Sequence, residues 1–153
     1  MPGARGAEVS SDMKDVFFYG TLCHLPLLEV VLGRAARDIV TEPARLSNHE
    51  VSWVVAERFP LISRKVGAVA EGILLRGVGE EDLARLAFYE GGFDYAFQTL
   101  DVETHKGAHA AEVFLSTPGK WSPGALWSLE DWVKTEAAVS LKAARDMMAW
   151  YGR

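Results

Sequence analysis

Cysteine is nearly absent from the sequence: Cys23 is the only one, so the chain cannot form an intrachain disulfide. A single cysteine is typical of a reducing compartment, and we therefore expect a cytoplasmic protein. Long apolar runs are also missing. None approaches the roughly 20 residues that a membrane-spanning helix needs. The first twelve residues lack the apolar core of a signal peptide, so we expect no secretion signal and no membrane partner.

Basic residues are scarce as well, with 16 Lys and Arg against 21 Asp and Glu, for a net charge of -5. No dense basic stripe is present, which disfavours nucleic acids and anionic membranes as partners. The 49% hydrophobic and 24% charged content is ordinary for a globular domain. We expect one domain over residues 15–153, with a C-terminal helix, after a flexible tail over residues 1–14.

Short apolar runs alternate with helical patterns along the chain. Strands are predicted over residues 16–19, 51–56, 68–75, 97–104 and 110–116, and helices over residues 25–33, 80–89 and from residue 128 onward. Gly72 indicates a bulge or a close approach within its strand. Ser128 and Asp131 approximate a capping box. The elements show no regular strand-helix-strand rhythm, which favours an α+β fold around a mainly antiparallel curved sheet or small barrel.

One carboxylate, Glu90, lies at the end of the predicted helix over residues 80–89 and is followed by two glycines. Leu83, Leu86, Ala87 and Glu90 are spaced by three and four residues and share one helix face. Burial and the partial negative charge of a helix C-terminus both raise the pKa of a carboxyl group, as general acid/base chemistry requires. The alternative from periodicity is a solvated residue at a frayed helix end.

A glycine turn at Tyr19, Gly20, Thr21 and Leu22 joins the first predicted strand to the first predicted helix. Consecutive backbone N–H groups in such a turn can form an anion-binding concavity, suited to a carboxylate or a developing oxyanion. An ordinary strand-to-helix turn is the alternative interpretation.

These two segments occur in a recognisable order. The Tyr-Gly-Thr-Leu turn comes first, Phe59-Pro60-Leu61 and the strand over residues 69–75 follow, and a Leu-x-x-Tyr-Glu-Gly helix end occupies residues 86–91. In this arrangement the chain resembles the γ-glutamyl cyclotransferase-like family, which also includes the plant avirulence-induced proteins. The resemblance covers roughly residues 17–115. It implies a compact, mixed and mainly antiparallel β-barrel flanked by helices.

The resemblance also implies a reaction, in which the α-amine of a small γ-glutamyl-type substrate attacks its own side-chain carbonyl. The products are 5-oxoproline and an amine, and neither a metal nor an organic cofactor is required. By the resemblance, Glu90 is the general acid/base, residues 19–22 hold the substrate through their backbone, and Tyr95 lines the pocket. Ala87 and Phe97 depart from residues common in the family, so a non-catalytic binding or regulatory module with the same pocket stays open.

The C-terminal extension from residue 121 resembles bacterial versions of this domain, some of which are joined to a Nudix hydrolase domain. The chain itself contains no Nudix-like glutamate box. Whether it forms a homodimer stays open at this stage.

Three other groups invite a functional interpretation. Cys23 beside His24 suggests a thiol nucleophile, although sequence neighbours rarely have the required geometry and a small residue under the loop is the alternative. His105 and His109 have a metal-like spacing, but they flank an expected turn, which favours a solvated hairpin. The tryptophans at positions 121, 127, 132 and 150 suggest a binding platform, but such residues more often cover the core.

Overall fold

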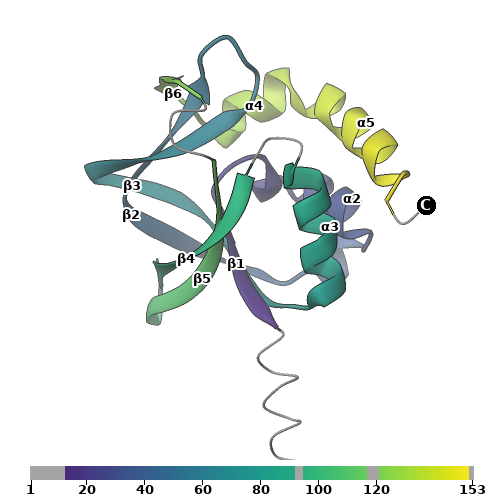
Figure 1. The fold of residues 1–153 in the computed structure, drawn as a ribbon, viewed down its shortest axis with the longest axis horizontal. Helices are drawn as coiled ribbons and strands as arrows, with labels where there is room; N and C mark the ends of the chain where they lie inside the picture. The colour runs from purple at the N-terminus through teal and green to yellow at the C-terminus, as the bar shows by residue number, and fades with distance from the viewer. Residues whose placement is uncertain (1–12, 92–94, 117–120, 152–153) are drawn as a thin grey trace, which may run out of the picture.

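Five strands close into a barrel in the computed structural model, which describes residues 13–91, 95–116 and 121–151 (Figure 1). They are β1 (Lys14–Phe18), β2 (Thr41–Val54), β3 (Pro60–Val78), β4 (Tyr95–Thr104) and β5 (Gly107–Ser116). The barrel runs in the order β3-β1-β5-β4-β2, and β2 pairs with β3 to complete the circle. The pair β1–β5 is parallel and the other four neighbouring pairs are antiparallel. The predicted mixed, mainly antiparallel barrel is confirmed.

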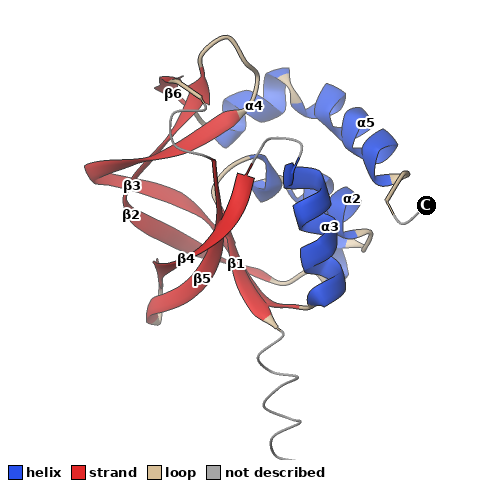
Figure 2. Cartoon of the chain, in the orientation of Figure 1, coloured by secondary structure: helices blue, strands red, loops and turns tan. Residues whose placement is uncertain are grey.

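The α-helices of the described chain lie on one side of the barrel and across one of its ends (Figure 2). They are α2 (Leu25–Leu32), α3 (Glu80–Gly91), α4 (Leu129–Thr135) and α5 (Ala137–Met148), and two short 3-10 helices, η1 (Thr21–Cys23) and η2 (Ala36–Asp38), flank α2. Helix α2 packs against both α3 and α5. Helices α2, α3 and α5 therefore form one packed group beside the barrel.

Strand β1 shows how the core is divided. Val16 and Phe18 are buried in the cluster that also contains the helix residues Leu86 and Trp132. Phe17, between them, is buried in a second cluster made of residues from the barrel strands. Because successive side chains of a strand point to opposite faces, β1 is apolar on both sides. This explains why it appears in the sequence as a continuous apolar run.

Strands β2 and β3 are much longer than the strands predicted over residues 51–56 and 68–75. They pair almost continuously from Thr41 opposite Leu75 to Trp53 opposite Pro60, with one irregularity beside Asn48. Residues 60–61 already belong to β3, and the turn between the two strands occupies residues 55–59. Much of this hairpin is exposed, and its polar residues obscure the apolar pattern by which strands are recognised.

Gly72 lies where β3 meets β1. A Cβ atom at this position would collide with the backbone carbonyl oxygen of Phe18. The predicted close approach is confirmed, because only glycine leaves room for the neighbouring backbone.

The chain after residue 120 differs from prediction in two ways. A short strand, β6 (Pro123–Leu126), which is absent from the predicted strands, extends the sheet beyond β2. The predicted single helix is two helices, α4 and α5, separated at Glu136. The predicted cap is confirmed, since the Ser128 hydroxyl accepts a hydrogen bond from the Asp131 amide at 3.1 Å. None of the described helices combines the length and apolarity needed to cross a membrane.

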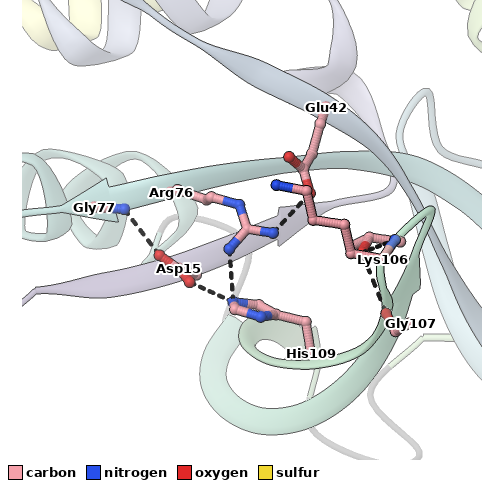
Figure 3. Close-up of polar contacts among 8 residues, drawn as sticks. Asp15, Glu42, Arg76, Gly77, Lys106, Gly107 and His109 are labelled. Atoms are coloured by element: carbon pink, nitrogen blue, oxygen red, sulfur yellow. Dashed lines mark hydrogen bonds and ion pairs between the residues drawn. The ribbon is translucent and has the colours of Figure 1, made fainter.

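A polar network joins four strands near the start of β1 (Figure 3). Asp15 accepts a hydrogen bond from the Gly77 amide at 2.8 Å and lies 2.5 Å from Nε2 of His109. Arg76 approaches the same Nε2 at 3.5 Å and pairs with Glu42 at 2.8 Å. Partial burial raises the pKa of Asp15, but the contacts with His109 and Gly77 outweigh it and hold that pKa below its ordinary value. The network fixes the end of β1 that lies away from the glycine turn.

Candidate active site

A cavity of about 260 Å³ opens where β1 ends, between the last turn of α3 and the helices α4 and α5. Five residues singled out from the sequence line it: Tyr19, Gly20, Thr21, Leu22 and Glu90. The glycine turn and the acidic helix end, about 70 positions apart in the chain, therefore share one hollow. The side chain of the sixth, Tyr95, lies outside the described part of the chain, although its backbone begins β4 opposite Ser116.

Glu90 is on the last turn of α3, and only 8% of it is exposed. Burial raises the pKa of its carboxyl group from 4.5 to about 8. Within residues 13–91, 95–116 and 121–151, neither a hydrogen bond nor an ion pair offsets this effect at the carboxylate. The group is therefore poised to gain or lose a proton close to neutral pH.

The inward face of α3 is rotated slightly from the predicted one. Leu86, Tyr89 and Glu90 are buried and Leu83 packs against the core, but Ala87 is exposed. The prediction that Ala87 faces inward is wrong. The buried face includes Tyr89 instead. Tyr89 and Glu90 follow Leu86 by three and four residues, so all three share one helix face.

The glycine turn is tightly wound. The amides of Cys23 and His24 donate to the carbonyls of Gly20 and Thr21, both at 3.0 Å. In the described chain no backbone carbonyl accepts from the amides of Thr21 and Leu22, as expected at the start of a helical turn. Both residues line the cavity, and a turn with such N–H groups can form an anion-binding concavity.

Packing fixes the position of this turn. A Cβ atom at Gly20 would lie 2.9 Å from Cγ of Pro60, so a larger residue would force the turn away from β3. The Tyr19 hydroxyl donates to the Phe114 carbonyl at 2.7 Å, which ties the preceding residue to β5.

Tyr89 connects the two halves of the site and was not assigned a role from the sequence. Its hydroxyl forms a hydrogen bond with Thr21, so the residue before Glu90 touches the glycine turn. Burial, and then the neighbouring Glu90 charge, raise the pKa of Tyr89 well above its ordinary value, which keeps the phenol neutral. The Tyr-Glu-Gly motif contained this residue, but only the three-dimensional contact shows what it does.

An ion pair on the cavity wall involves two residues that no sequence motif indicated. Nη1 of Arg58 lies 2.8 Å from Oε2 of Glu136. The Glu136 side chain is 11% exposed and that of Arg58 is 82% exposed. Glu136 follows the buried Trp132 by four residues, a spacing that places the two on one helix face. Nothing in the local sequence distinguishes Arg58.

The other candidates from the sequence do not assemble into sites. The Cys23 thiol donates to the Phe18 carbonyl at 3.2 Å, and burial raises its pKa to about 12, the opposite of an activated thiol. His24 packs edge-on against Trp132, with ring centres 5.7 Å apart. His109 lies in the Asp15 network at the far end of β1, and the described residues contain no cluster of three metal-ligating side chains.

The tryptophans do not form a common platform. Trp132 is fully buried in the core, whereas Trp150 is 67% exposed.

Comparison with known proteins identifies the family. The family model for gamma-glutamyl cyclotransferase, AIG2-like, matches residues 16–134, which is most of the chain. The chain therefore belongs to this family. A γ-glutamyl cyclotransferase-type activity is accordingly supported in general form. Among curated proteins, no sequence matches the chain.

Several solved structures share the fold. A protein from Arabidopsis thaliana has a TM-score of 0.64 at 19% identity, over 93% of this chain and 95% of its own. A gamma-glutamyl cyclotransferase has a TM-score of 0.61 at 14% identity, over 90% and 87%. An AIG2-like protein from Mus musculus has a TM-score of 0.54 at 18% identity, over 76% and 88%. At these identities the likeness establishes the barrel and its flanking helices.

Proposed function

We propose that the cavity releases 5-oxoproline and an amine from a small γ-glutamyl-type substrate, with Glu90 as the general acid/base. The observation that carries the proposal is the burial of the Glu90 carboxylate on the same cavity as the glycine turn, with a pKa near 8. The amides of Thr21 and Leu22 suit the α-carboxylate of a glutamyl group or the oxyanion that develops during attack.

The proton balance follows from this arrangement. The substrate enters with its α-amine protonated, and ionised Glu90 removes one proton to free the amine. The nitrogen then attacks the side-chain carbonyl carbon, and a five-membered ring forms. Glu90 returns its proton to the departing nitrogen. It then takes a second proton from the ring nitrogen and passes this proton to the departing nitrogen as well. The old amide bond breaks, the amine leaves as an ammonium ion, and Glu90 is ionised again.

In this scheme the protein contributes two effects, positioning of the substrate and proton transfer. Because attack is intramolecular, holding the substrate in a folded conformation supplies much of the rate. A positioned carboxyl group typically contributes about 10²- to 10⁴-fold. Tyr89 supports this role, since its contact with Thr21 keeps the acidic helix end and the turn at a fixed separation.

The test is turnover of a panel of γ-glutamyl amines and peptides, with 5-oxoproline measured by mass spectrometry. We expect Glu90→Gln to lower kcat/KM by about 10²- to 10⁴-fold. Glu81→Gln, which neutralises an exposed carboxylate on the same helix, serves as the matched control and should leave turnover unchanged. Circular dichroism checks that both variants are folded.

Two results would contradict the proposal. Turnover that survives in folded Glu90→Gln would remove Glu90 from the chemistry. Binding of γ-glutamyl compounds without any turnover by the wild type would favour a non-catalytic binding or regulatory module that keeps the same pocket.

A further inference from the structure

The cavity carries a pair of charges that the proton transfer does not use. Arg58 lies in the turn between β2 and β3, and Glu136 lies at the junction of α4 and α5; both line the cavity wall. Their side chains meet at 2.8 Å. In Figure 1 the turn between β2 and β3 reaches the same end of the molecule as α4.

The backbone around each residue is well fixed. Before Arg58, the amide of Val54 donates to Phe59 at 3.0 Å and that of Val55 donates to Ser122 at 2.9 Å, so the turn is tied to its own hairpin and to the chain entering β6. The amide of Glu136 donates to Trp132 at 2.7 Å and closes the last turn of α4. The ion pair therefore joins two anchored segments, and it holds a long cationic side chain at a defined place on the cavity.

The lining residues differ in exposure, so the cavity has a buried end and an exposed end. Glu90 and Leu22 are almost fully buried, at 8% and 4%, whereas Val139 is 72% exposed and the Arg58 side chain is 82% exposed. The buried end holds the proton-transferring carboxylate, so ring closure belongs there. The part of the substrate that leaves as an amine then extends toward the exposed end, where Arg58 lies.

The two charges are not equally available. Glu136 is mostly buried and already paired, whereas a guanidinium group has five N–H donors and Glu136 engages it through a single nitrogen, Nη1. The remaining donors of Arg58 form a planar fork that matches a carboxylate. This position therefore binds an anionic group on the ligand more favourably than a cationic one.

We propose that Arg58, oriented by Glu136, is a specificity residue that binds an acidic group on the departing amine. The preferred substrates are then γ-glutamyl derivatives of amines that carry a carboxylate, rather than of neutral or cationic amines. This inference rests on the proposed function and assigns Arg58 to the leaving half of the substrate, separate from the glutamyl half at the glycine turn.

The experiment compares γ-glutamylglycine with γ-glutamylglycinamide, which differ only in that one charged group. We expect the wild type to prefer the acid by about 10- to 100-fold in kcat/KM, the size of a charge-assisted contact. Arg58→Gln should remove that preference, mainly by raising the KM for γ-glutamylglycine. Arg58→Lys should restore part of it. Arg64→Gln, an exposed arginine on the same hairpin, is the matched control and should keep the preference.

The outcomes separate the two proposals. Equal losses on both substrates in Arg58→Gln would overturn the assignment, because Arg58 would then serve the glutamyl half or the fold. A wild type that turns over both substrates equally would overturn it too, with the proposed function intact. A wild type that turns over neither would refute the proposed function, and the role of Arg58 with it.

Discussion

Replacing Glu90 by glutamine should change how the stability of the protein depends on pH. Below pH 4.5 the carboxyl group is neutral in both the folded and the unfolded chain, so its titration has no effect there. Between pH 4.5 and about 8 the unfolded chain loses this proton while the folded chain keeps it. The free energy of unfolding therefore falls as pH rises through this window, and the full cost of burying the charge applies above it.

The magnitude follows from the two pKa values. A tenfold change in proton affinity corresponds to about 1.4 kcal/mol, so a rise from 4.5 to about 8 is equivalent to about 5 kcal/mol at most. This is a large share of the roughly 5–15 kcal/mol that stabilises a typical domain. Glu90→Gln has no such group to ionise and should gain stability relative to the wild type as pH increases.

The assay is urea denaturation of both proteins from pH 5 to pH 9, with Glu81→Gln as a control for loss of an exposed charge on α3. We expect the difference between Glu90→Gln and the wild type to increase by several kcal/mol across the range, and the control to follow the wild type. Parallel curves for Glu90→Gln and the wild type would refute the reasoning, since they would mean that Glu90 titrates alike in both states.

Three further predictions concern other positions. Gly72→Ala should destabilise the fold by about 3 kcal/mol or more, or prevent folding, because its Cβ would collide with the Phe18 carbonyl; thermal denaturation measures this, and a native-like Tm would contradict it. Cys23 should react with a thiol reagent at pH 8 far more slowly than in urea, because burial holds its pKa near 12; equal rates would show an accessible thiolate. Ser128→Ala should cost about 1 kcal/mol by removing the cap on the Asp131 amide, whereas Ser128→Asp should retain most of it in the same urea titration.

The sequence predicted the barrel and the two motif segments, since both depend on local patterns. The apolar run ending at Gly20 and the inward position of Glu90 follow from strand and helix periodicity. The order of the two motifs along the chain then indicated the family, and with it the barrel fold. Their meeting in one cavity is a property of strand order, which brings the end of β1 beside the end of α3. That arrangement is not encoded in any single segment.

The parts that were missed depend on longer-range structure. The turn that carries Arg58 is defined by the pairing of two long, partly exposed strands, and their polar residues hide that pairing. Glu136 lies at the break between α4 and α5, where the sequence predicts one continuous helix. The expected roles of Glu90, of residues 19–22 and of Tyr95 stay predictions, and for Tyr95 the described residues include only the backbone.

The parallel pairing of β1 with β5 has a consequence for how the molecule assembles. Val16 and Phe17 pair with Glu112 and Val113, so this contact spans almost a hundred residues of chain. Contacts of such long range form slowly, because the intervening loop must close first. During synthesis, the backbone groups on one edge of β1 therefore lack their hydrogen-bond partners until β5 has been made. The glycine turn directly follows β1, so the pocket is completed only when the barrel closes.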